Sequence, residues 1–565
     1  MRLQSVIIPG EQQNTELYYR GGMSLAAGGT LSFDTYFNSF CYTRYREYTT
    51  ADSVTFSCRF SGSAKVRLCS FDGEEHVVAS GEFTDGADIT ASFSTLPENG
   101  FLYPKITALT DVVFTSGEYT SACTPAEISC CIAICTYKRE EYVLKNTELL
   151  RGYRFSFIDR VFVIDNGNTL DASALSDGFV RVLANRNFGG SGGFTRGLIE
   201  ALDGGYSHVI LMDDDVEFHP EILERMTVFA SILRSEYSNA HFGTGMLSRN
   251  MPYMQYEMGG AVWDGRRVCG GRHNVDVRVP QALLENLTGN EINYGAWWCF
   301  LMPVADIREY RLPYPFFIKI DDVEYGLRTC SHAPIITMNG IAVCHDDFDN
   351  KYSMHLEYYN VRNQLVMNTA QGRDPLKNAL YRLFAVSFKH LVLYRYDSIP
   401  MILRAFRDYL KGVDFFLGCD EEKLNAELIR TAPKLQPLSD IPGWREEMRN
   451  SPRGDDNTVL TARALLTLAG HIYPWFMLKK EPGAAPLSRA GASDTLGRRE
   501  VIQYQLAGDT GVVTRRNVGK FIVCSAKVIG MAFRLLFTCG RAKRSYQTRS
   551  AEISSLEFWR GHLGI

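Results

Sequence analysis

Three consecutive carboxylates follow an apolar run in the segment Leu211-Met-Asp-Asp-Asp-Val-Glu. Like charges this close repel one another unless a cation or hydrogen bonds compensate them. Carboxylate oxygens suit hard divalent ions such as Mg²⁺ or Mn²⁺. In an extended chain, Asp213 and Asp215 point to one side and Asp214 points to the other. The segment therefore predicts a metal site, and the alternative is a polar turn that caps a helix beginning near Pro220.

Two more clusters supply groups for proton transfer and metal binding. The segment Phe316-Phe-Ile-Lys-Ile-Asp-Asp-Val-Glu ends an apolar run in Asp321 and Asp322, with Glu324 close by. A carboxylate near other negative charge binds protons more tightly and can serve as a general base. His345 ends the apolar run Ala342-Val-Cys-His, and we interpret it as a third metal ligand. The alternative is a histidine that is satisfied in the core or acts as a cap.

Two segments have the composition of ligand contacts. In Asn187-Phe-Gly-Gly-Ser-Gly-Gly-Phe, four glycines in five positions free the backbone to approach a ligand, and a following helix would offer its N-terminus to an anion. We interpret this loop as a diphosphate or sugar contact, and the alternative is a flexible turn. Trp297 and Trp298 are adjacent and would face opposite sides of a strand. One of them can therefore be a platform for a sugar ring, and the alternative is that both are core residues.

Alternating strands and helices are predicted to position these clusters. Near-continuous apolar runs, typical of strands buried on both faces, occupy residues 128–137, 160–167, 180–185 and 208–215. Helix-like stretches separate them, such as residues 139–151. This alternation predicts a mostly parallel sheet with helices on both faces, and ligands bind beyond the carboxyl ends of such strands. We therefore expect every cluster above to lie at a strand end.

The flanking regions have different patterns. Residues 1–122 alternate polar and apolar residues with period two and without helical periodicity, which predicts an antiparallel β-sandwich of jelly-roll type. Residues 123–350 form the predicted α/β domain, and residues 351–565 form a mainly helical region. Within that region, residues 480–498 are rich in Pro, Gly, Ala and Ser and predict an exposed loop.

The stretch from residue 510 to residue 550 contains nine Lys or Arg and no acidic residue. Interleaved apolar residues make it a basic amphipathic segment that suits an anionic membrane surface. The alternative is a tail helix that packs on the preceding helices with a solvated basic face. No uninterrupted apolar stretch of about 20 residues is present, so we expect no transmembrane helix.

Composition excludes several classes of protein. With 45% hydrophobic and 22% charged residues, the 565-residue chain is not a largely disordered protein. A net charge of −4, from 60 basic and 64 acidic residues, gives no indication of nucleic-acid binding. The 14 cysteines form no metal-type pair of CxxC motifs, and we interpret them as buried free thiols in a reducing compartment. The N-terminal sequence has no signal-peptide pattern, so we expect a cytoplasmic protein.

Taken in order, the motifs resemble those of glycosyltransferase family 2 enzymes with the GT-A fold, an α/β Rossmann-like mixed sheet. Within that family, the chain is similar to the polymerising galactofuranosyltransferases of the mycobacterial galactan type. That resemblance implies the same three-part organisation, with an N-terminal sandwich and a helical C-terminal region. The glycine-rich loop, the Trp pair and the Phe-Ile-Lys-Ile-Asp-Asp-Val-Glu-Tyr-Gly run are the most specific features.

The resemblance also implies a role for each matching position. Asp213, Asp215 and His345 would hold Mn²⁺ or Mg²⁺, and Asp322 would be the general base with Asp321 beside it. Arg139 and Asp165, together with Asp214, would contact the nucleotide. The sugar and acceptor sites would be shaped by Gly190, Ser191, Gly192, Gly193, Trp297, Trp298, Lys319 and Glu324.

The implied reaction is transfer of galactofuranose from UDP-galactofuranose to a hydroxyl of a glycan, with inversion at the anomeric carbon. The expected acceptor is a lipid-linked glycan, so the enzyme would act peripherally on the inner face of the plasma membrane. A homo-oligomer is a further partner that the sequence allows. The alternatives are another nucleotide-sugar donor, a non-catalytic glycan-binding protein and a metal-dependent phosphatase or nucleotidyltransferase.

Overall fold

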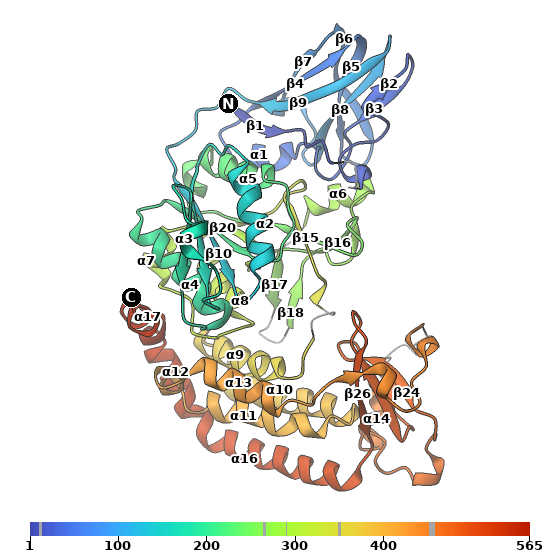
Figure 1. Ribbon diagram of the computed structural model, residues 1–565, viewed down its shortest axis with the longest axis vertical. Helices are drawn as coiled ribbons and strands as arrows, with labels where there is room; N and C mark the ends of the chain where they lie inside the picture. Colours follow the sequence, from blue (N-terminus) through green and yellow to red (C-terminus); the bar gives the residue numbers. More distant parts are fainter. Residues whose placement is uncertain (11–13, 264–266, 290, 349–351, 451–457) are drawn as a thin grey trace.

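Two antiparallel sheets form the N-terminal part of the computed structural model, which describes all residues except 11–13, 264–266, 290, 349–351 and 451–457 (Figure 1). One sheet has the order β1-β9-β4-β7, with β2 pairing on β9, and the other has the order β3-β8-β5-β6. The strands of the first sheet are β1 (Arg2–Ser5), β2 (Ser24–Leu25), β4 (Ser53–Ser61), β7 (Ala87–Ser92) and β9 (Val112–Thr120). Those of the second are β3 (Thr30–Ser32), β5 (Ser63–Phe71), β6 (Glu75–Thr84) and β8 (Phe101–Ala108).

The period-two pattern of the sequence is the cause of this sandwich. Along β4, Val54, Phe56 and Cys58 are buried and alternate with more exposed residues, so one face of the strand packs on the opposite sheet. The sequence of this region shows no helical periodicity, yet one short helix, α1 (Tyr42–Tyr48), lies between β3 and β4. Its Tyr42 and Tyr45 are fully buried, so packing of large aromatic side chains stabilises this short helix.

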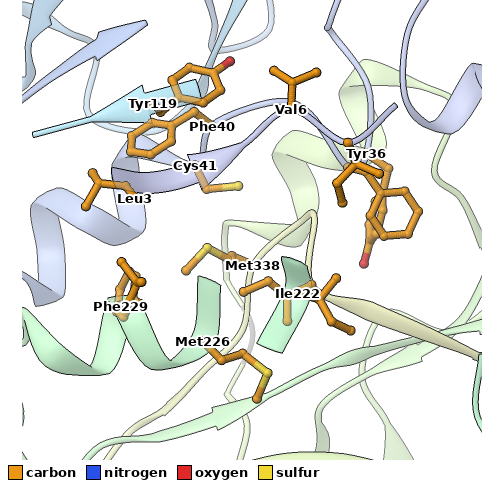
Figure 2. Close-up of a cluster of buried hydrophobic side chains, with 14 of the residues drawn as sticks. Leu3, Val6, Tyr36, Phe40, Cys41, Tyr119, Ile222, Met226, Phe229 and Met338 are labelled. Atoms are coloured by element: carbon orange, nitrogen blue, oxygen red, sulfur yellow. The ribbon is translucent and has the colours of Figure 1, made fainter. Parts of the chain in front are cut away.

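The sandwich and the central part of the chain share one hydrophobic core. Figure 2 shows Leu3, Phe40 and Tyr119 of the sandwich close to Ile222 and Phe229, which belong to α5 (Glu221–Ser231). A buried guanidinium also joins the two parts. Arg225 donates hydrogen bonds to the carbonyls of Phe37 (2.7 Å), Gly340 (2.9 Å) and Ser5 (2.6 Å). The sandwich is therefore packed against α5 of the central part.

The central sheet has seven strands in the order β12-β11-β10-β13-β20-β14-β21. They are β10 (Cys130–Thr136), β11 (Ile158–Asp165), β12 (Val180–Ala184), β13 (His208–Asp213), β14 (His241–Gly243), β20 (Cys299–Pro303) and β21 (Ile335–Ile336). The four strands from β10 to β13 pair in parallel, and β20 is antiparallel to both of its neighbours. All but one residue of β10 is buried, as expected for a strand covered on both faces.

Helices cover this sheet and a smaller sheet extends from it. The helices are α2 (Glu140–Arg151), α3 (Ala172–Leu175), α4 (Gly189–Asp203), α5, α6 (Pro280–Asn286), α7 (Ala305–Tyr310) and α8 (Asp321–Thr329). The smaller sheet has the order β19-β16-β15-β22, and its strands are β15 (Gly245–Ser248), β16 (Met254–Met258), β19 (Val275–Asp276) and β22 (Ala342–His345). A hairpin, β17 (Gly260–Trp263) and β18 (Arg267–Gly270), lies beside it. The thirteen cysteines whose side chains are described form no disulfide.

The C-terminal part is helical but also contains a small sheet. Its helices are α9 (Leu356–Ala370), α10 (Pro375–Val392), α11 (Ile399–Tyr409), α12 (Val413–Leu417), α13 (Glu421–Thr431), α14 (Thr458–Leu466), α15 (Ala492–Thr495), α16 (Val518–Arg549) and α17 (Leu556–Leu563). The sheet has the order β23-β26-β25-β24, with β23 (Gln436–Pro437), β24 (Gly483–Pro486), β25 (Glu500–Tyr504) and β26 (Thr510–Arg515).

This small sheet corrects the interpretation of residues 480–498 as an exposed loop. The strand β24 lies within that segment, and Ala485 and Leu487 are buried. Small residues gave no hydrophobic signal in the sequence, yet they allow the close packing of β24 against β25 and against Leu393, which follows α10. The basic tail is likewise divided into the strand β26 and the long helix α16.

The helix α16 is long and apolar enough to cross a membrane, although core helices of other proteins pass the same test. One such helix is weak evidence for a crossing, so the expectation of no transmembrane helix stays a prediction. Lys527 and Arg534 interrupt the apolar sequence, but they leave long apolar stretches around them. In Figure 1, α16 runs along the lower edge of the molecule, below α11.

Candidate active site

The three predicted metal ligands come together at one point of the structure. The Asp213 carboxylate lies at the end of β13, Asp215 lies two residues beyond it, and His345 ends β22. Their potential ligand atoms all lie within 4.8 Å of one another, and Nε2 of His345 is 3.1 Å from Oδ1 of Asp215. Two carboxylates and an imidazole are a donor set that suits a divalent cation. These side chains therefore form a candidate metal site.

The cluster is fixed by the residues around Asp214. That buried carboxylate accepts hydrogen bonds from the Thr136 hydroxyl (2.6 Å) and from the Arg139 guanidinium (3.0 Å). The same guanidinium nitrogen is 2.7 Å from Oδ2 of Asp215. Thr136 ends β10 and Arg139 precedes α2, so the chain reversal after the first parallel strand positions the acidic segment. Asp214 is thus turned away from the candidate metal site, as the x-D-x-D alternation predicts.

A second guanidinium supports the cluster from the opposite side. Arg249 donates to the carbonyl of Asp215 (2.5 Å) and to the Asp346 carboxylate (2.8 Å). It therefore links the segment after β13 to the segment after β22, and keeps Asp215 beside His345. Sequence analysis gave no reason to select Arg249, because its partners lie 34 and 97 residues away in the chain.

The electrostatics of the cluster favour a cation. Burial and the nearby Asp215 charge raise the pKa of Asp213 to about 7, well above the ordinary value for aspartate. Burial likewise raises the pKa of Asp214. Carboxylates that resist ionisation because other negative charges are near are stabilised when a positive ion binds between them.

Two adjoining cavities open beside this cluster. The larger, of about 780 Å³, is lined by Arg139, Asp213, Asp215 and His345 and extends to α9 and α10. The smaller, of about 390 Å³, is lined by Asp321, Asp322 and the Trp pair. The side chains of Asp213, Ile318, Lys319 and Phe348 line both cavities. Groups bound at the candidate metal site and at the acid pair are therefore neighbours.

The acid pair lies at the start of a helix and not at a strand end, which corrects the expectation from the sequence. Asp321 is the first residue of α8, and the preceding turn holds Phe317, Lys319 and Ile320 at positive φ. Positive φ is strained for such residues. Asn363 of α9 stabilises the turn by donating to the carbonyls of Ile318 (3.0 Å) and Lys319 (2.8 Å). Sequence reasoning missed Asn363.

Both carboxyl groups of the pair have an increased proton affinity. Burial and the neighbouring Asp322 charge raise the pKa of Asp321 to about 7. Burial also raises the pKa of Asp322, whose Oδ1 accepts a hydrogen bond from the Val323 amide at 2.8 Å. A carboxylate with a raised pKa that faces a cavity has the properties of a general base.

Trp297 and Trp298 both line the smaller cavity, and both are 4% exposed. They precede β20 and belong to different core clusters on opposite sides of the central sheet. The indole of Trp297 packs edge-on against Phe194, and that of Trp298 donates a hydrogen bond to the Thr244 hydroxyl (3.0 Å). Core packing and a contact with a bound sugar are therefore compatible for both residues.

The glycine-rich segment is not a loop, because Gly189 to Gly193 are the first five residues of α4. Only Gly190 lines a cavity, where it faces the Asp321 carboxylate. Gly192 and Gly193 are buried, and a Cβ on either would lie 2.2 Å from Phe188 or Cys135, respectively. The absence of a side chain at both positions is needed for helix packing. Ligand contacts for Gly192 and Gly193 stay a prediction that this packing does not favour.

Gly189 and Ser191 hold the strained turn that precedes the acid pair. Gly189 has φ +66°, and a Cβ there would lie 2.0 Å from the Phe317 carbonyl oxygen. The Ser191 hydroxyl is buried and donates to the Tyr314 carbonyl (2.6 Å). The segment thus positions Asp321 and Asp322 through the backbone of residues 314–317, and it keeps Ser191 out of both cavities.

Replacement of Gly193 by alanine is expected to destabilise the protein by about 1–3 kcal/mol, because the added methyl group overpacks the α4–β10 contact. The matched control is Gly530→Ala in α16, where a Cβ meets nothing within 4 Å. Since alanine is a better helix former, that change is expected to stabilise by about 0.5–1 kcal/mol. Thermal unfolding of both variants checks the pair. Equal changes of stability in Gly193→Ala and Gly530→Ala would show that close packing at Gly193 is not the cause.

Two further predicted site residues lie outside the cavities. The Asp165 carboxylate is 2% exposed and accepts hydrogen bonds from the amides of Gly167, Thr169 and Leu170, so it is satisfied by its own turn. Glu324 is fully buried and pairs with Arg328, with 2.7 Å between Oε1 and Nε. A nucleotide contact of Asp165 and a sugar contact of Glu324 stay predictions, and this geometry does not bring either side chain to the site.

Glu257 is a cavity residue that sequence reasoning missed. It lies on β16 and lines the smaller cavity with Asp322. Burial and the Asp322 charge raise its pKa to about 7. The only signal in the sequence is the polar pair Gln255 and Glu257 at period two, which places both side chains on one face of the strand.

Comparison with known proteins relates this part of the chain to a known family. Residues 131–235, which include β10, α4 and the Asp213–Asp215 cluster, match the family model described as glycosyl transferase family 2. The chain is a glycosyltransferase with a family 2 domain. The central mixed sheet, together with this match, confirms the predicted α/β GT-A fold class. Residues 6–122 match a second model, described as galactofuranosyltransferase 2 N-terminal.

Two curated relatives of this glycosyltransferase align over most of its length. Galactofuranosyltransferase GlfT2 of Mycolicibacterium smegmatis is 24% identical over 469 residues, covering 75% of this chain and 72% of the relative. The protein of the same name from Mycobacterium tuberculosis is 25% identical over 444 residues, covering 72% and 69%. Among solved structures, a mannosyltransferase from Pyrobaculum calidifontis in complex with GDP-Man and Mn²⁺ matches with a TM-score of 0.30 and 12% identity, covering 55% of this chain and 81% of that one.

Proposed function

We propose that this enzyme transfers galactofuranose from UDP-galactofuranose to a glycan hydroxyl with inversion. The observation that carries the proposal is the adjacency of two sites. A candidate divalent-metal site, made by Asp213, Asp215 and His345, adjoins a cavity that contains a half-buried carboxylate pair. Transfer from a nucleotide sugar requires charge compensation at a diphosphate next to a base for the acceptor.

The choice of galactofuranose rests on similarity. Both curated relatives are named galactofuranosyltransferases, and the model matched by residues 6–122 also carries that name. The alternative donors UDP-galactopyranose, UDP-glucose and dTDP-rhamnose would use the same metal and base chemistry. The pyranose donors would place a different ring between Trp297, Trp298 and Lys319.

The residues around the candidate metal site would bind the donor. Asp213, Asp215 and His345 would hold Mn²⁺ or Mg²⁺, and a bound ion supplies a Lewis acid for the charge that develops on the leaving diphosphate. Arg139 lines the same cavity and adds a positive charge on the side of β10. Lys319 lines both cavities, and its ammonium group lies over the Phe348 ring. It would orient the donor sugar at this point.

Asp322 would act as the general base. Its carboxylate takes the proton of the acceptor hydroxyl while that oxygen forms a bond to the anomeric carbon. The bond from this carbon to the diphosphate oxygen breaks, and UDP leaves with the electron pair. One displacement inverts the configuration, as in single-displacement glycosidases. Asp321, which lies beside Gly190, would remain a hydrogen-bonding partner in the sugar site.

A donor panel tests the proposal. Purified enzyme with Mn²⁺ and a galactofuranosyl acceptor should release UDP from UDP-galactofuranose and not from UDP-galactopyranose or UDP-glucose. Release from UDP-galactopyranose alone would overturn the choice of donor. Absence of release from every nucleotide sugar would favour a non-catalytic glycan-binding protein.

We further propose that α16 lies on an anionic membrane at the inner face of the plasma membrane, where a lipid-linked acceptor is met. Val518, Ile522, Ile529, Phe533 and Leu536 are exposed and recur at three- to seven-residue spacing, so they share one face of the helix. The opposite face, with Val528 and Leu535, is buried against the other C-terminal helices. Because that face would lose its packing in a bilayer core, the helix suits the interface and not a crossing.

A second apolar surface adjoins the start of α16. Trp475, Phe476 and Met477 are 68%, 70% and 63% exposed. Arg516 joins this segment to α16 by donating to the carbonyls of His471 (2.5 Å) and Tyr473 (2.7 Å). The two surfaces together present exposed aromatic and aliphatic side chains among basic residues, which is the composition of an interfacial anchor.

Replacement of Ile529 by glutamate is expected to weaken binding to phosphatidylglycerol vesicles about tenfold or more, because it removes an apolar contact and adds a repelled charge. The matched control is Val77→Glu in β6, because Ile529 and Val77 are 52% and 53% exposed. Vesicle sedimentation measures the partition. If both variants lose binding equally, or neither does, the membrane proposal is wrong.

A further inference from the structure

The larger cavity continues well beyond the residues that the proposed reaction uses. Past the candidate metal site it runs between α9 and α10. We call this extension the α9–α10 arm, and its polar side chains are Tyr352, Glu357, Asn360, Gln364, Arg382 and Lys389. A volume of about 780 Å³ for the whole cavity lies in the upper part of the ~300–1,000 Å³ range of ligand pockets. The cavity therefore has room for more than a nucleotide diphosphate.

The arm offers mixed hydrogen-bonding groups over an apolar floor. Leu356 and Val386 supply apolar surface. Within the described part of the chain, the Asn360 amide has no hydrogen-bond partner, and neither does the Ser488 hydroxyl, whose oxygen is buried. A buried hydroxyl without a partner costs free energy unless a ligand satisfies it. Amide and hydroxyl groups beside apolar surface match the alternating O–H and C–H groups of a sugar chain.

The charges of the arm are close to balanced. Glu357 accepts a hydrogen bond from the Tyr352 hydroxyl (2.9 Å) and lies 3.8 Å from the Lys389 ammonium. Arg382 donates to the side-chain carbonyl of Gln364. With Arg382 bound to Gln364, and with the Lys389 charge partly balanced by Glu357, the arm is suited to a neutral polyol more than to a second phosphate group.

The arm is continuous with the place where the acceptor reacts. Ile318, Lys319 and Phe348 line both cavities, so they form the passage from Asp322 to the arm. The Lys319 ammonium lies 4.8 Å from the centre of the Phe348 ring. An acceptor whose terminal hydroxyl reaches Asp322 can therefore extend its preceding sugars past Phe348 and between α9 and α10.

We propose that the α9–α10 arm binds the acceptor glycan behind the sugar that receives the transferred residue. This inference rests on the proposed function, since it assumes a saccharide acceptor. It assigns Asn360, Lys389 and Ser488 as contacts of the glycan chain. The affinity of the enzyme for an acceptor should then increase with acceptor length.

Calorimetric titration without donor tests this assignment. The probes are a galactofuranosyl disaccharide and a galactofuranosyl hexasaccharide. The wild-type enzyme should bind the hexasaccharide about tenfold more tightly. Asn360→Ala and Lys389→Ala should each weaken hexasaccharide binding about three- to tenfold and leave disaccharide binding unchanged. Lys377→Ala is the matched control, because Lys377 is exposed on the same helix and outside the cavity.

Two results would overturn the proposal. One is equal affinity of the wild-type enzyme for the two probes, or hexasaccharide binding that is unchanged in both arm variants. The other is weaker binding of UDP in these variants, which would assign the arm to the donor. Length-dependent binding without use of UDP-galactofuranose would refute the proposed donor and leave the arm assignment in place.

Discussion

Replacement of Asp322 by asparagine is expected to lower kcat by about 10²–10⁴-fold, the usual contribution of a positioned general base. Asparagine keeps the shape of the side chain but does not accept a proton. The UDP dissociation constant should stay nearly unchanged, because Asp322 lines only the smaller cavity, whereas Asp215 and His345 line only the larger one. Steady-state kinetics and UDP titration measure the two effects.

Asp321→Asn is the control for this assignment. Asp321 and Asp322 are adjacent and both half-buried, so only their positions distinguish them. A smaller loss of kcat in Asp321→Asn supports Asp322 as the base. The assignment is refuted if Asp322→Asn retains full activity, or if Asp321→Asn alone abolishes transfer.

The pH dependence of kcat/KM should report the ionisation of the Asp322 carboxylate. Burial raises the pKa of Asp322, so the group becomes protonated at a higher pH than the ordinary value of about 4. Only the unprotonated carboxylate accepts a proton, so kcat/KM is expected to fall as the pH decreases through this raised pKa. In Asp322→Asn the residual activity should lose this acidic limb.

The second large effect concerns the candidate metal site. Asp215→Ala is expected to abolish measurable Mn²⁺ binding and to lower kcat/KM by at least about 10²-fold, because several kcal/mol of charge stabilisation is lost. Asp215 is the carboxylate that touches both His345 and Arg139, so its removal opens the donor set on two sides. Electron paramagnetic resonance with Mn²⁺ measures binding, and chelation should abolish wild-type activity.

The control for the metal prediction is Asp346→Asn. Asp346 follows His345 directly and is ion-paired with Arg249, but it lines neither cavity and is not one of the three candidate ligands. Its replacement should leave Mn²⁺ binding largely intact. If both variants lose Mn²⁺ binding equally, then Mn²⁺ binding depends on negative charge near His345 in general. It would not depend on the specific arrangement of Asp213, Asp215 and His345.

Much of the site follows from the sequence because its residues directly follow strands. Asp213 and His345 end β13 and β22, and strand ends bring distant segments to one place. The alternation around Asp214 also predicts its opposite orientation. The acid pair was recognised as a motif, but its local structure was wrong, because a strained turn with Ile320 at positive φ has no signal in an apolar run.

The rest depends on tertiary contacts that a single sequence does not reveal. Gly192 and Gly193 have the composition of a ligand loop, yet the sulfur of Cys135 and the ring of Phe188 decide their packing. Glu324 has the spacing of a site residue, but Arg328 one turn later pairs with it in the core. Glu257 and Arg249 contribute to the site through residues far away in the chain, so no local pattern marks them.

The central claim is transfer of galactofuranose, and product analysis tests it most directly. The enzyme is incubated with UDP-galactofuranose, Mn²⁺ and a galactofuranosyl acceptor, and the product is examined by mass spectrometry and NMR. The account predicts added hexose residues in the furanose form, with an anomeric configuration opposite to that of the donor. A product that retains the donor configuration, or acceptor that gains no furanose while another nucleotide sugar is consumed, would contradict it.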